Sequence, residues 1–189
     1  MAKKTSLFKT LGLGIFKGGL QPLPLSGQMT RHLNLTALTS LTDGTDTTPV
    51  AGTRFTSSIQ IPYTMTLTGI GYLIGTEGGT DKVLVELHDA DGTLIANSAL
   101  TVAGAPTVGT LATFQEVPFT APVEVLGPGT YYLSVTMNGT TARLRTIPTA
   151  RGASQVLLTK SATGTFGTVG NLTVPTTFTA GVAPIAYTY

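Results

Sequence analysis

The amino-acid sequence predicts an all-β fold, namely an antiparallel, jelly-roll-like β-sandwich that follows an extended N-terminal arm. Threonine, whose branched side chain suits a pleated sheet, makes up about a fifth of the 189 residues. The 23 Gly and 11 Pro separate short segments, as turn residues do in a sandwich. No convincing helical pattern follows residue 28. We therefore expect an arm over residues 1–28 and one sandwich domain over residues 29–189.

The arm combines apolar side chains with several glycines. Its apolar residues lie at helical spacing, but the four glycines between residues 12 and 19 would each cost about 1 kcal/mol in a helix interior. We therefore expect the arm to become ordered only when a partner protein buries its apolar side chains. A disordered tail is the alternative, although such tails contain few Phe and Leu residues. The arm residues predicted to bind the partner are Lys3, Lys4, Leu7, Phe8, Leu11, Ile15 and Phe16.

Alternation of apolar and polar residues predicts a series of short strands after the arm. In one of them Met65 and Leu67 share one face and Ile70 and Tyr72 share the other, and Gly69 stands at the switch, where a β-bulge is expected. The predicted strands cover residues 32–37, 55–61, 63–74, 83–87, 93–100, 111–119, 123–126, 131–137, 155–159, 172–178 and 182–189.

Two dipeptides predict tight hairpins. They are the Asp-Gly pair at residues 91–92 and the Asn-Gly pair at residues 138–139, the latter with the composition of a type I′ turn. On the strand expected to return from the second turn, Arg143 and Arg145 should point outward together. We predict that this basic pair also binds a partner.

Charge is segregated along the chain. Every acidic residue lies between Asp43 and Glu124, whereas both flanks carry only Lys and Arg, so the net charge of +2 hides a negative middle. Charged residues make up 11% of the chain, against about 25% in typical soluble domains. A weakly charged surface suits a subunit that its neighbours cover, and segregated charge orients such contacts. We therefore predict a homo-oligomer or a larger protein assembly.

No pattern of catalytic or metal-binding residues stands out. The chain has no Cys and only two His, and we expect His88 to face solvent at a strand end. Glu86, Glu116 and Glu124 occupy polar strand positions, where a solvated carboxylate is expected. A hairpin turn explains the acidic residues near Asp89 better than a calcium site does. The sequence therefore predicts no enzymatic activity, no cofactor and no metal.

Nucleic acid and membranes are not expected partners either. The pI of 9.0 reflects a small excess of positive charge on a weakly charged chain, without the dense basic face that nucleic acid requires. No window approaches the about 18 apolar residues of a membrane span. The basic N-terminus is followed by too short an apolar run for a signal peptide.

Tyrosines are the candidates for binding a sugar, because exposed aromatic rings stack on sugar faces and the chain has no Trp. We expect Tyr72 and Tyr131 in the core. Tyr132, Tyr187 and Tyr189 are expected at the surface, and we predict Tyr132 and Tyr187 as ligand-binding residues. The alternative is that these rings pack within the domain or against a neighbouring subunit.

The run at residues 125–135 (VLGPGTYYLSV), followed by NGTT at 138–141, resembles the late hairpin of β-sandwich domains in virion proteins of tailed bacteriophages. The run at residues 83–96 (VLVELHDADGTLIA) is similar to the paired strands of the same jelly-roll-like domains. The resemblance covers residues 55–147. It implies a structural or adsorption role in the phage particle and supplies no catalytic residues. The same hairpin pattern occurs in extracellular carbohydrate-binding sandwiches.

Together these features lead to one functional expectation and its alternatives. We expect a structural component of the virion, made in the host cytoplasm, such as a capsid decoration or cement protein or the base of a head fibre. Its partners would be the major capsid protein or other virion subunits, and copies of itself. The alternatives are a tail or adsorption component, or a carbohydrate-binding module that recognises a host-surface glycan.

Overall fold

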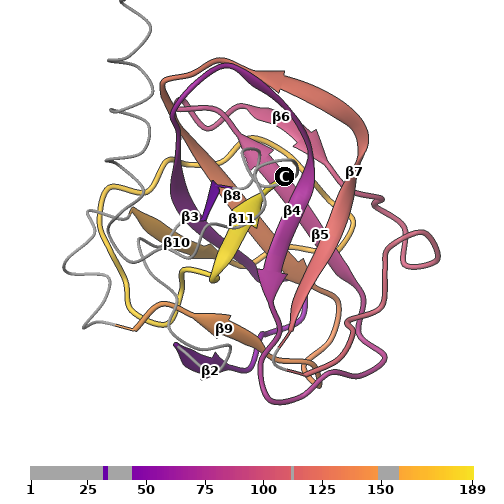
Figure 1. The fold of residues 1–189 in the computed structure, drawn as a ribbon. Helices are drawn as coiled ribbons and strands as arrows, with labels where there is room; N and C mark the ends of the chain where they lie inside the picture. Colours follow the sequence, from indigo (N-terminus) through magenta and orange to yellow (C-terminus); the bar gives the residue numbers. More distant parts are fainter. Residues whose placement is uncertain (1–31, 34–43, 112, 149–157) are drawn as a thin grey trace, which may run out of the picture. The chain divides into compact units, whose positions relative to one another are not determined.

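A computed structural model describes residues 32–33, 44–111, 113–148 and 158–189 of the chain (Figure 1). The predicted arm over residues 1–28 lies outside the described residues, as does most of the predicted strand at residues 32–37. Residues Arg31–Tyr189 belong to one compact unit. The described part of this unit contains β-strands and no helix, so the predicted all-β class is confirmed.

All strand pairs are antiparallel, and they form two larger sheets and one small sheet. The four-stranded sheet has the order β1-β11-β4-β7, the five-stranded sheet has the order β10-β3-β8-β5-β6, and β2 pairs with β9 alone. In Figure 1 the pair β2 and β9 lies at one end of the sandwich. The strands are β1 (His32–Leu33), β2 (Thr45–Thr47), β3 (Arg54–Ile61), β4 (Met65–Leu73), β5 (Val83–His88), β6 (Leu94–Asn97), β7 (Phe114–Val125), β8 (Gly129–Met137), β9 (Leu144–Thr146), β10 (Thr159–Ala162) and β11 (Ala186–Thr188).

The two larger sheets share one hydrophobic core. Side chains of opposite sheets meet there because alternate residues of each strand point inward. Each large apolar side chain that is fully buried contributes about 1.5–3 kcal/mol. The core residues of the central strands of the five-stranded sheet are Phe55, Ile59 and Ile61 on β3, Val83, Val85 and Leu87 on β5, and Tyr131, Leu133, Val135 and Met137 on β8.

The predicted phase change in β4 is present. The register between β4 and β7 shifts between Leu67 and Gly69, which pair with Val123 and Pro118 respectively. Because of this irregularity, residues on both sides of Gly69 face the same core, including Leu67 and Ile70. The sequence correctly indicated the position of the bulge.

Four strand predictions were wrong in extent or in existence. Residues 111–119 and 123–126 were expected as two short strands, but one strand, β7, runs through both because β4 pairs with its two halves on either side of the bulge. Residues 172–178 were expected as a strand and contain none. At the C-terminus only Ala186–Thr188 of the predicted 182–189 forms a strand.

The Asn-Gly pair at residues 138–139 does not form the predicted hairpin. The chain that follows β8 leaves the five-stranded sheet, and β9 pairs with β2 instead. The cause is Asp81, whose carboxylate accepts hydrogen bonds from the backbone N–H groups of Thr141 and Ala142, each at 2.8 Å. The backbone of Asn138 also bonds to the carbonyl of Lys82, at 3.1 Å.

We predict that Asp81→Ala lowers the free energy of unfolding by about 1–3 kcal/mol, because it leaves backbone donors near a buried site without their acceptor. Urea denaturation followed by circular dichroism measures this effect. Asp91→Ala is the matched control. Its side chain is exposed in the turn between β5 and β6, so the free energy should change by no more than about 0.5 kcal/mol. Equal effects of the two substitutions would contradict the role given to Asp81.

Candidate functional site

The outer face of the five-stranded sheet is polar, yet it is buried. Across β3, β8 and β5, Thr56, Ser134 and Glu86 form one lateral row. Ser58, Tyr132 and His88 form the next row. All six side chains are buried. A sheet face of this composition normally meets solvent, so another part of the chain must cover it.

Residues 163–172, here called the covering loop, lie over this face. The loop follows β10, which pairs with β3 at the sheet edge. At its far end the N–H of Leu172 donates to the carbonyl of Gly92 at 2.7 Å. Between these ends the carbonyl of Gly170 accepts a hydrogen bond from Nε2 of His88 at 3.0 Å. The loop is therefore held at both edges of the sheet and above β5.

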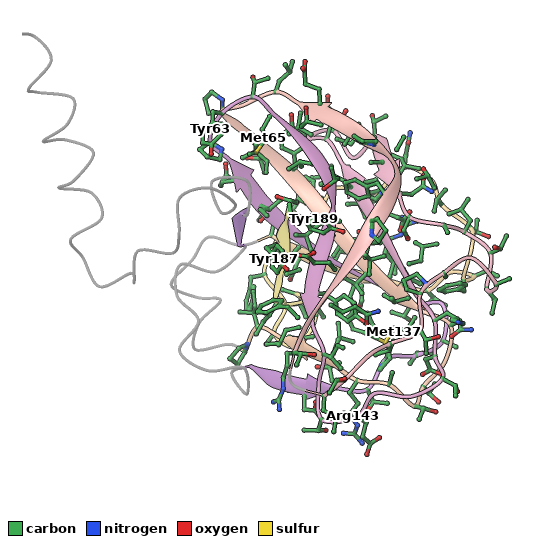
Figure 2. The ribbon with its side chains drawn as sticks, turned by 45° about the vertical axis from the view of Figure 1, so that its right-hand side comes forward. Tyr63, Met65, Met137, Arg143, Tyr187 and Tyr189 are labelled. Atoms are coloured by element: carbon green, nitrogen blue, oxygen red, sulfur yellow. The ribbon has the colours of Figure 1, made fainter. Side chains whose placement is uncertain are left out.

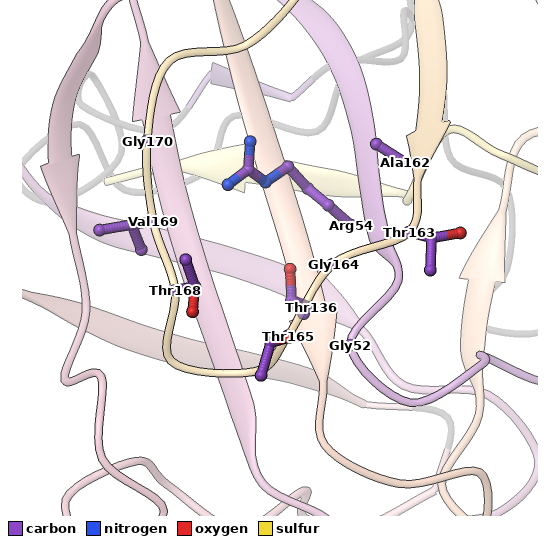
Figure 3. A pocket seen from close by; sticks show the side chains of 10 residues that line it. All are labelled: Gly52, Arg54, Thr136, Ala162, Thr163, Gly164, Thr165, Thr168, Val169 and Gly170. Carbon is purple, nitrogen blue, oxygen red and sulfur yellow. The ribbon is translucent and has the colours of Figure 1, made fainter.

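A charged pair lies beneath the loop. The Arg54 side chain starts on β3 and extends across β8 toward β5, as Figure 3 shows. Its Nε lies 2.7 Å from Oε2 of Glu86, and its Nη2 donates to Oε1 at 2.8 Å. The Glu86 side chain is fully buried, whereas that of Arg54 is 16% exposed. The contact pairs the buried carboxylate with a cation and gives Oε1 a hydrogen bond, whereas Oε2 is close to Nε but accepts no hydrogen bond from a described residue.

Burial shifts the protonation of both titratable groups on β5. Burial raises the pKa of Glu86 to about 7, although the charge of Arg54 and the backbone N–H of Gly170 act in the opposite direction. Burial also lowers the pKa of His88, although its contacts with the backbone of Gly170 and Tyr132 partly oppose this. At neutral pH His88 is therefore uncharged, and Glu86 is close to its midpoint.

A small pocket opens beside this pair. It encloses about 210 Å³ and is lined by Gly52, Arg54, Thr136, Ala162, Thr163, Gly164, Thr165, Thr168, Val169 and Gly170 (Figure 3). Among these residues Arg54 is the only charged one. Neither Glu86 nor His88 lines the pocket, so a molecule held there would contact Arg54 and threonine hydroxyls but not the two titratable groups on β5.

The predicted exposure of Glu86 and His88 was wrong, since both side chains are 0% exposed. They do lie on the outer face of the sheet, as their polar positions indicated, but the covering loop takes the place of solvent. Alternation within residues 83–88 gives the face correctly and says nothing of a segment more than 70 residues later. The adjacent Asp89 side chain accepts bonds from the N–H groups of Asp91 and Thr93, as in the predicted hairpin turn.

The predicted exposure of Tyr132 and Tyr187 was also wrong. Tyr132 is 3% exposed and lies beside His88 in its row. Tyr187 is 8% exposed, and its hydroxyl donates to Oε1 of Glu116 at 2.9 Å. Its ring lies against Gly71 of β4, where an added Cβ would come within 2.3 Å of it. Neither ring offers a face for a sugar, whereas Tyr72 and Tyr131 lie in the core as predicted.

Two neighbouring rings extend this aromatic contact along the outer face of the four-stranded sheet. The ring centroid of Tyr187 lies 5.1 Å from that of Phe114 and 6.2 Å from that of Tyr189. Figure 2 shows Tyr187 and Tyr189 side by side. Tyr189, which was also expected at the surface, is half-buried. The C-terminal residues are therefore packed into the domain.

Arg143 and Arg145 have partners within the domain. Nη1 of Arg143 lies 3.2 Å from Oδ2 of Asp46, and Nε of Arg145 lies 3.9 Å from Oδ1 of the same residue. Arg145 is buried, so the prediction that both side chains point outward together was wrong for Arg145. Burial raises the pKa of Asp46. Hydrogen bonds from Thr76 and Arg143 and the charge of Arg145 outweigh burial, so the pKa lies below its ordinary value.

Several predicted features lie outside the described residues. They are the arm residues Lys3, Lys4, Leu7, Phe8, Leu11, Ile15 and Phe16. Within the described residues, no group of three or more His, Asp or Glu side chains is arranged to hold a metal ion. The same part of the chain contains no helix long and apolar enough to cross a membrane.

The fold and the pocket define an all-β sandwich module whose outer sheet face is covered by its own C-terminal region. The chain belongs to the family described as Domain of unknown function (DUF4082), which it matches over residues 37–182. The match includes β2 to β10, the covering loop and the pocket, and excludes residues 1–36. The comparison with curated proteins finds no match.

We predict that Glu86 makes the domain less stable as the pH rises. The pKa of Glu86 is raised from its ordinary value of 4.5 to about 7, so between these values the folded chain holds the proton more tightly than the unfolded chain. The free energy of unfolding of the wild type, minus that of Glu86→Gln, should therefore fall by about 1–3 kcal/mol from pH 4.5 to 7.5. Urea denaturation at a series of pH values measures this difference.

Both proteins contain His88, so its contribution cancels in the difference between the wild type and Glu86→Gln. That contribution is opposite in sign to that of Glu86, because the lowered pKa of His88 makes it stabilise the fold increasingly as the pH rises toward 6.5. Glu124→Gln is the control, because the Glu124 side chain is exposed on β7 and the same difference should stay flat. If the free energy of unfolding of the wild type instead rises with pH relative to that of Glu86→Gln, the charge of Arg54 outweighs burial in setting the pKa of Glu86, contrary to this prediction.

Proposed function

We propose that this chain is a non-enzymatic structural subunit of a larger assembly, specifically of a tailed-phage particle. In this proposal the sandwich forms the body, and residues 1–28 attach it to neighbouring virion subunits. A position on the capsid surface, as a decoration or cement protein or as the base of a head fibre, fits this arrangement best. A tail or adsorption component would use the same parts.

The observation that carries the proposal is how the domain uses its charges. Asp46 pairs with Arg143 and Arg145, Glu77 lies 3.5 Å from Arg143, and Arg54 pairs with Glu86. Asp81, Asp89, Glu116 and Lys82 each make a hydrogen bond within the chain. Among the described residues, only Asp91, Glu124 and Lys160 carry a charge without such a contact. Most charged side chains of the described domain are therefore engaged within the chain, which favours close contact with neighbouring subunits over dispersal in solution.

The geometry of the candidate site also favours binding over catalysis. The two groups with shifted pKa values, Glu86 and His88, are covered and do not line the pocket. A general acid or base must reach within about 2.6–3.2 Å of the proton that it transfers. A molecule in the pocket is separated from both groups by Arg54 and Gly170.

The charge pairs modify how neighbouring copies would meet. Arg143 and Arg145 were predicted to bind a partner, but Asp46 already neutralises them in part. In this proposal the apolar side chains of residues 1–28 therefore provide most of the binding free energy. Burial of each would contribute about 1.5–3 kcal/mol, while ordering costs about 1–2 kcal/mol per residue. A single arm would bind weakly, and many copies on a lattice would bind firmly through multivalency.

The carbohydrate-binding alternative loses the residues on which it was based. Tyr132 and Tyr187 are buried in the domain and hold contacts there. We therefore do not retain these residues as a sugar-stacking platform.

We predict that the double substitution Leu11→Ser and Phe16→Ser abolishes incorporation into particles but leaves the domain folded. The reason is that the two substitutions remove apolar surface from residues 1–28 and change no residue of the sandwich. The measurement is the amount of each variant in purified particles after complementation of a phage that lacks the wild-type chain, with circular dichroism as the folding check.

The control is Thr5→Ala with Thr10→Ala in the same segment, which should be incorporated normally. Normal incorporation of the Leu11 and Phe16 variant would contradict attachment through this segment. Failure of the wild-type chain itself to join any particle would contradict the virion role.

A further inference from the structure

Neither the fold nor the proposed structural role explains the polar lining of the pocket beside Arg54. A loop that only covers a sheet could pack apolar side chains onto it. The covering loop instead presents Thr163, Thr165 and Thr168 at the pocket, with Gly164 and Gly170. These residues line the pocket together with Arg54, whose side chain is 16% exposed.

Arg54 retains hydrogen-bonding capacity on the pocket side. Its pair with Glu86 uses Nε and Nη2, which leaves Nη1 with its two N–H groups. No described residue accepts a hydrogen bond from Nη1. Of the two members of the pair, only Arg54 is partly exposed and lines the pocket, whereas Glu86 is fully buried and does not.

We propose that this pocket binds a small oxyanion, a carboxylate or phosphate group, through Nη1 of Arg54 and the threonine hydroxyls of the covering loop. Guanidinium groups bind carboxylate and phosphate oxygens strongly because of their planar array of donors. Thr hydroxyls add donors without adding bulk. No acidic side chain among the described lining residues opposes an anion.

The size of the pocket limits the ligand. About 210 Å³ is less than the roughly 300–1,000 Å³ typical of pockets for drug-sized ligands. The pocket therefore accepts an inorganic anion, or the acidic group and adjacent atoms of a larger molecule such as an acidic sugar. The lining residues described include no aromatic ring, so recognition rests on the oxyanion and not on stacking.

The buried carboxylate makes this site sensitive to pH. Glu86, with its pKa near 7, competes with the ligand for the charge of Arg54, and its protonation leaves that charge to the ligand. The other titratable groups close to Glu86 are His88 on β5 itself and Tyr132 on β8. The described residues of β6 and the covering loop contribute none. We therefore expect tighter binding at pH 6 than at pH 8.

The test is a titration of the full-length chain with acetate, inorganic phosphate and glucuronate, followed by 1H–15N correlation spectra at pH 6 and pH 8. Binding should give saturable shifts of the amides of Gly164, Thr165, Thr168 and Gly170. The three probes separate a planar carboxylate, a tetrahedral anion and a carboxylate carried by a sugar. Whichever probe binds most tightly identifies the source of the oxyanion.

Matched substitutions separate the site from general attraction to a cation. Thr168→Val should weaken binding about three- to tenfold, the loss expected for one hydrogen bond. Glu86→Gln should strengthen binding at pH 8 several-fold and remove most of its pH dependence. The double variant Arg54→Gln with Glu86→Gln keeps two hydrogen-bonding amides in place of the charged pair and should abolish the saturable shifts.

Lys160→Gln is the control, because Lys160 is a cation on β10 near the start of the covering loop and does not line the pocket. Two results would overturn the proposal. One is the absence of saturable shifts at these amides with all three probes at both pH values. The other is equal weakening by Lys160→Gln and by the double variant, which would mean that the anions respond only to net charge. Neither result bears on the assembly role proposed above.

Discussion

The five-stranded sheet is buried on both faces, and most of the structure follows from that constraint. One face packs on the hydrophobic core and obeys the usual rule for a sandwich. The other face is polar, and every group on it must find a partner within the protein, because a buried polar group without one costs about 1–3 kcal/mol. The Arg54–Glu86 pair and the contact between His88 and Gly170 meet part of that requirement, while Oε2 of Glu86 and Nδ1 of His88 have no hydrogen-bond partner among the described residues. The covering loop must therefore follow one path, which is fixed at Gly92, at Gly170 and through β10 at the sheet edge.

The buried charges help to set this arrangement, although a buried ion pair contributes little net stability by itself. Replacement of the pair by apolar side chains of similar size would leave the sheet covered, and the free energy of unfolding need not fall. Such a replacement would remove the Arg54 side chain from the pocket lining. It would also remove the coupling between the charge of Arg54 and the protonation of Glu86. The pair therefore makes more sense as part of a binding site than as a stabilising contact. The same reasoning separates it from Asp46, Arg143 and Arg145, which link β2 to β9 and the residue before β9 in the small sheet and line no comparable described pocket.

The assembly role and the pocket rest on different parts of the chain. The proposed role in a particle rests on the internal pairing of the charged side chains of the domain and on the composition of residues 1–28. The pocket rests on the covering loop and Arg54, both of which lie inside the family match over residues 37–182. Residues 1–36 lie outside that match. Attachment would therefore be a property of this chain, whereas any ligand of the pocket would be a property of the family domain, in those members that keep an arginine at the position of Arg54.

The sequence by itself determined the all-β class, most strand positions, the bulge at Gly69 and the inward residues of β8, because these depend on neighbours a few positions away along the chain. It did not determine where the polar faces would lie relative to solvent. Glu86 and His88 point to the side that alternation indicates, but a segment from 163 to 172 covers them, and only the tertiary structure brings it there. In the same way, Asn138-Gly139 has the local chemistry of a hairpin, and the carboxylate of Asp81, more than 50 residues earlier, redirects the chain. Local periodicity fixes which side of a strand a residue faces, and only long-range contacts decide what meets that side.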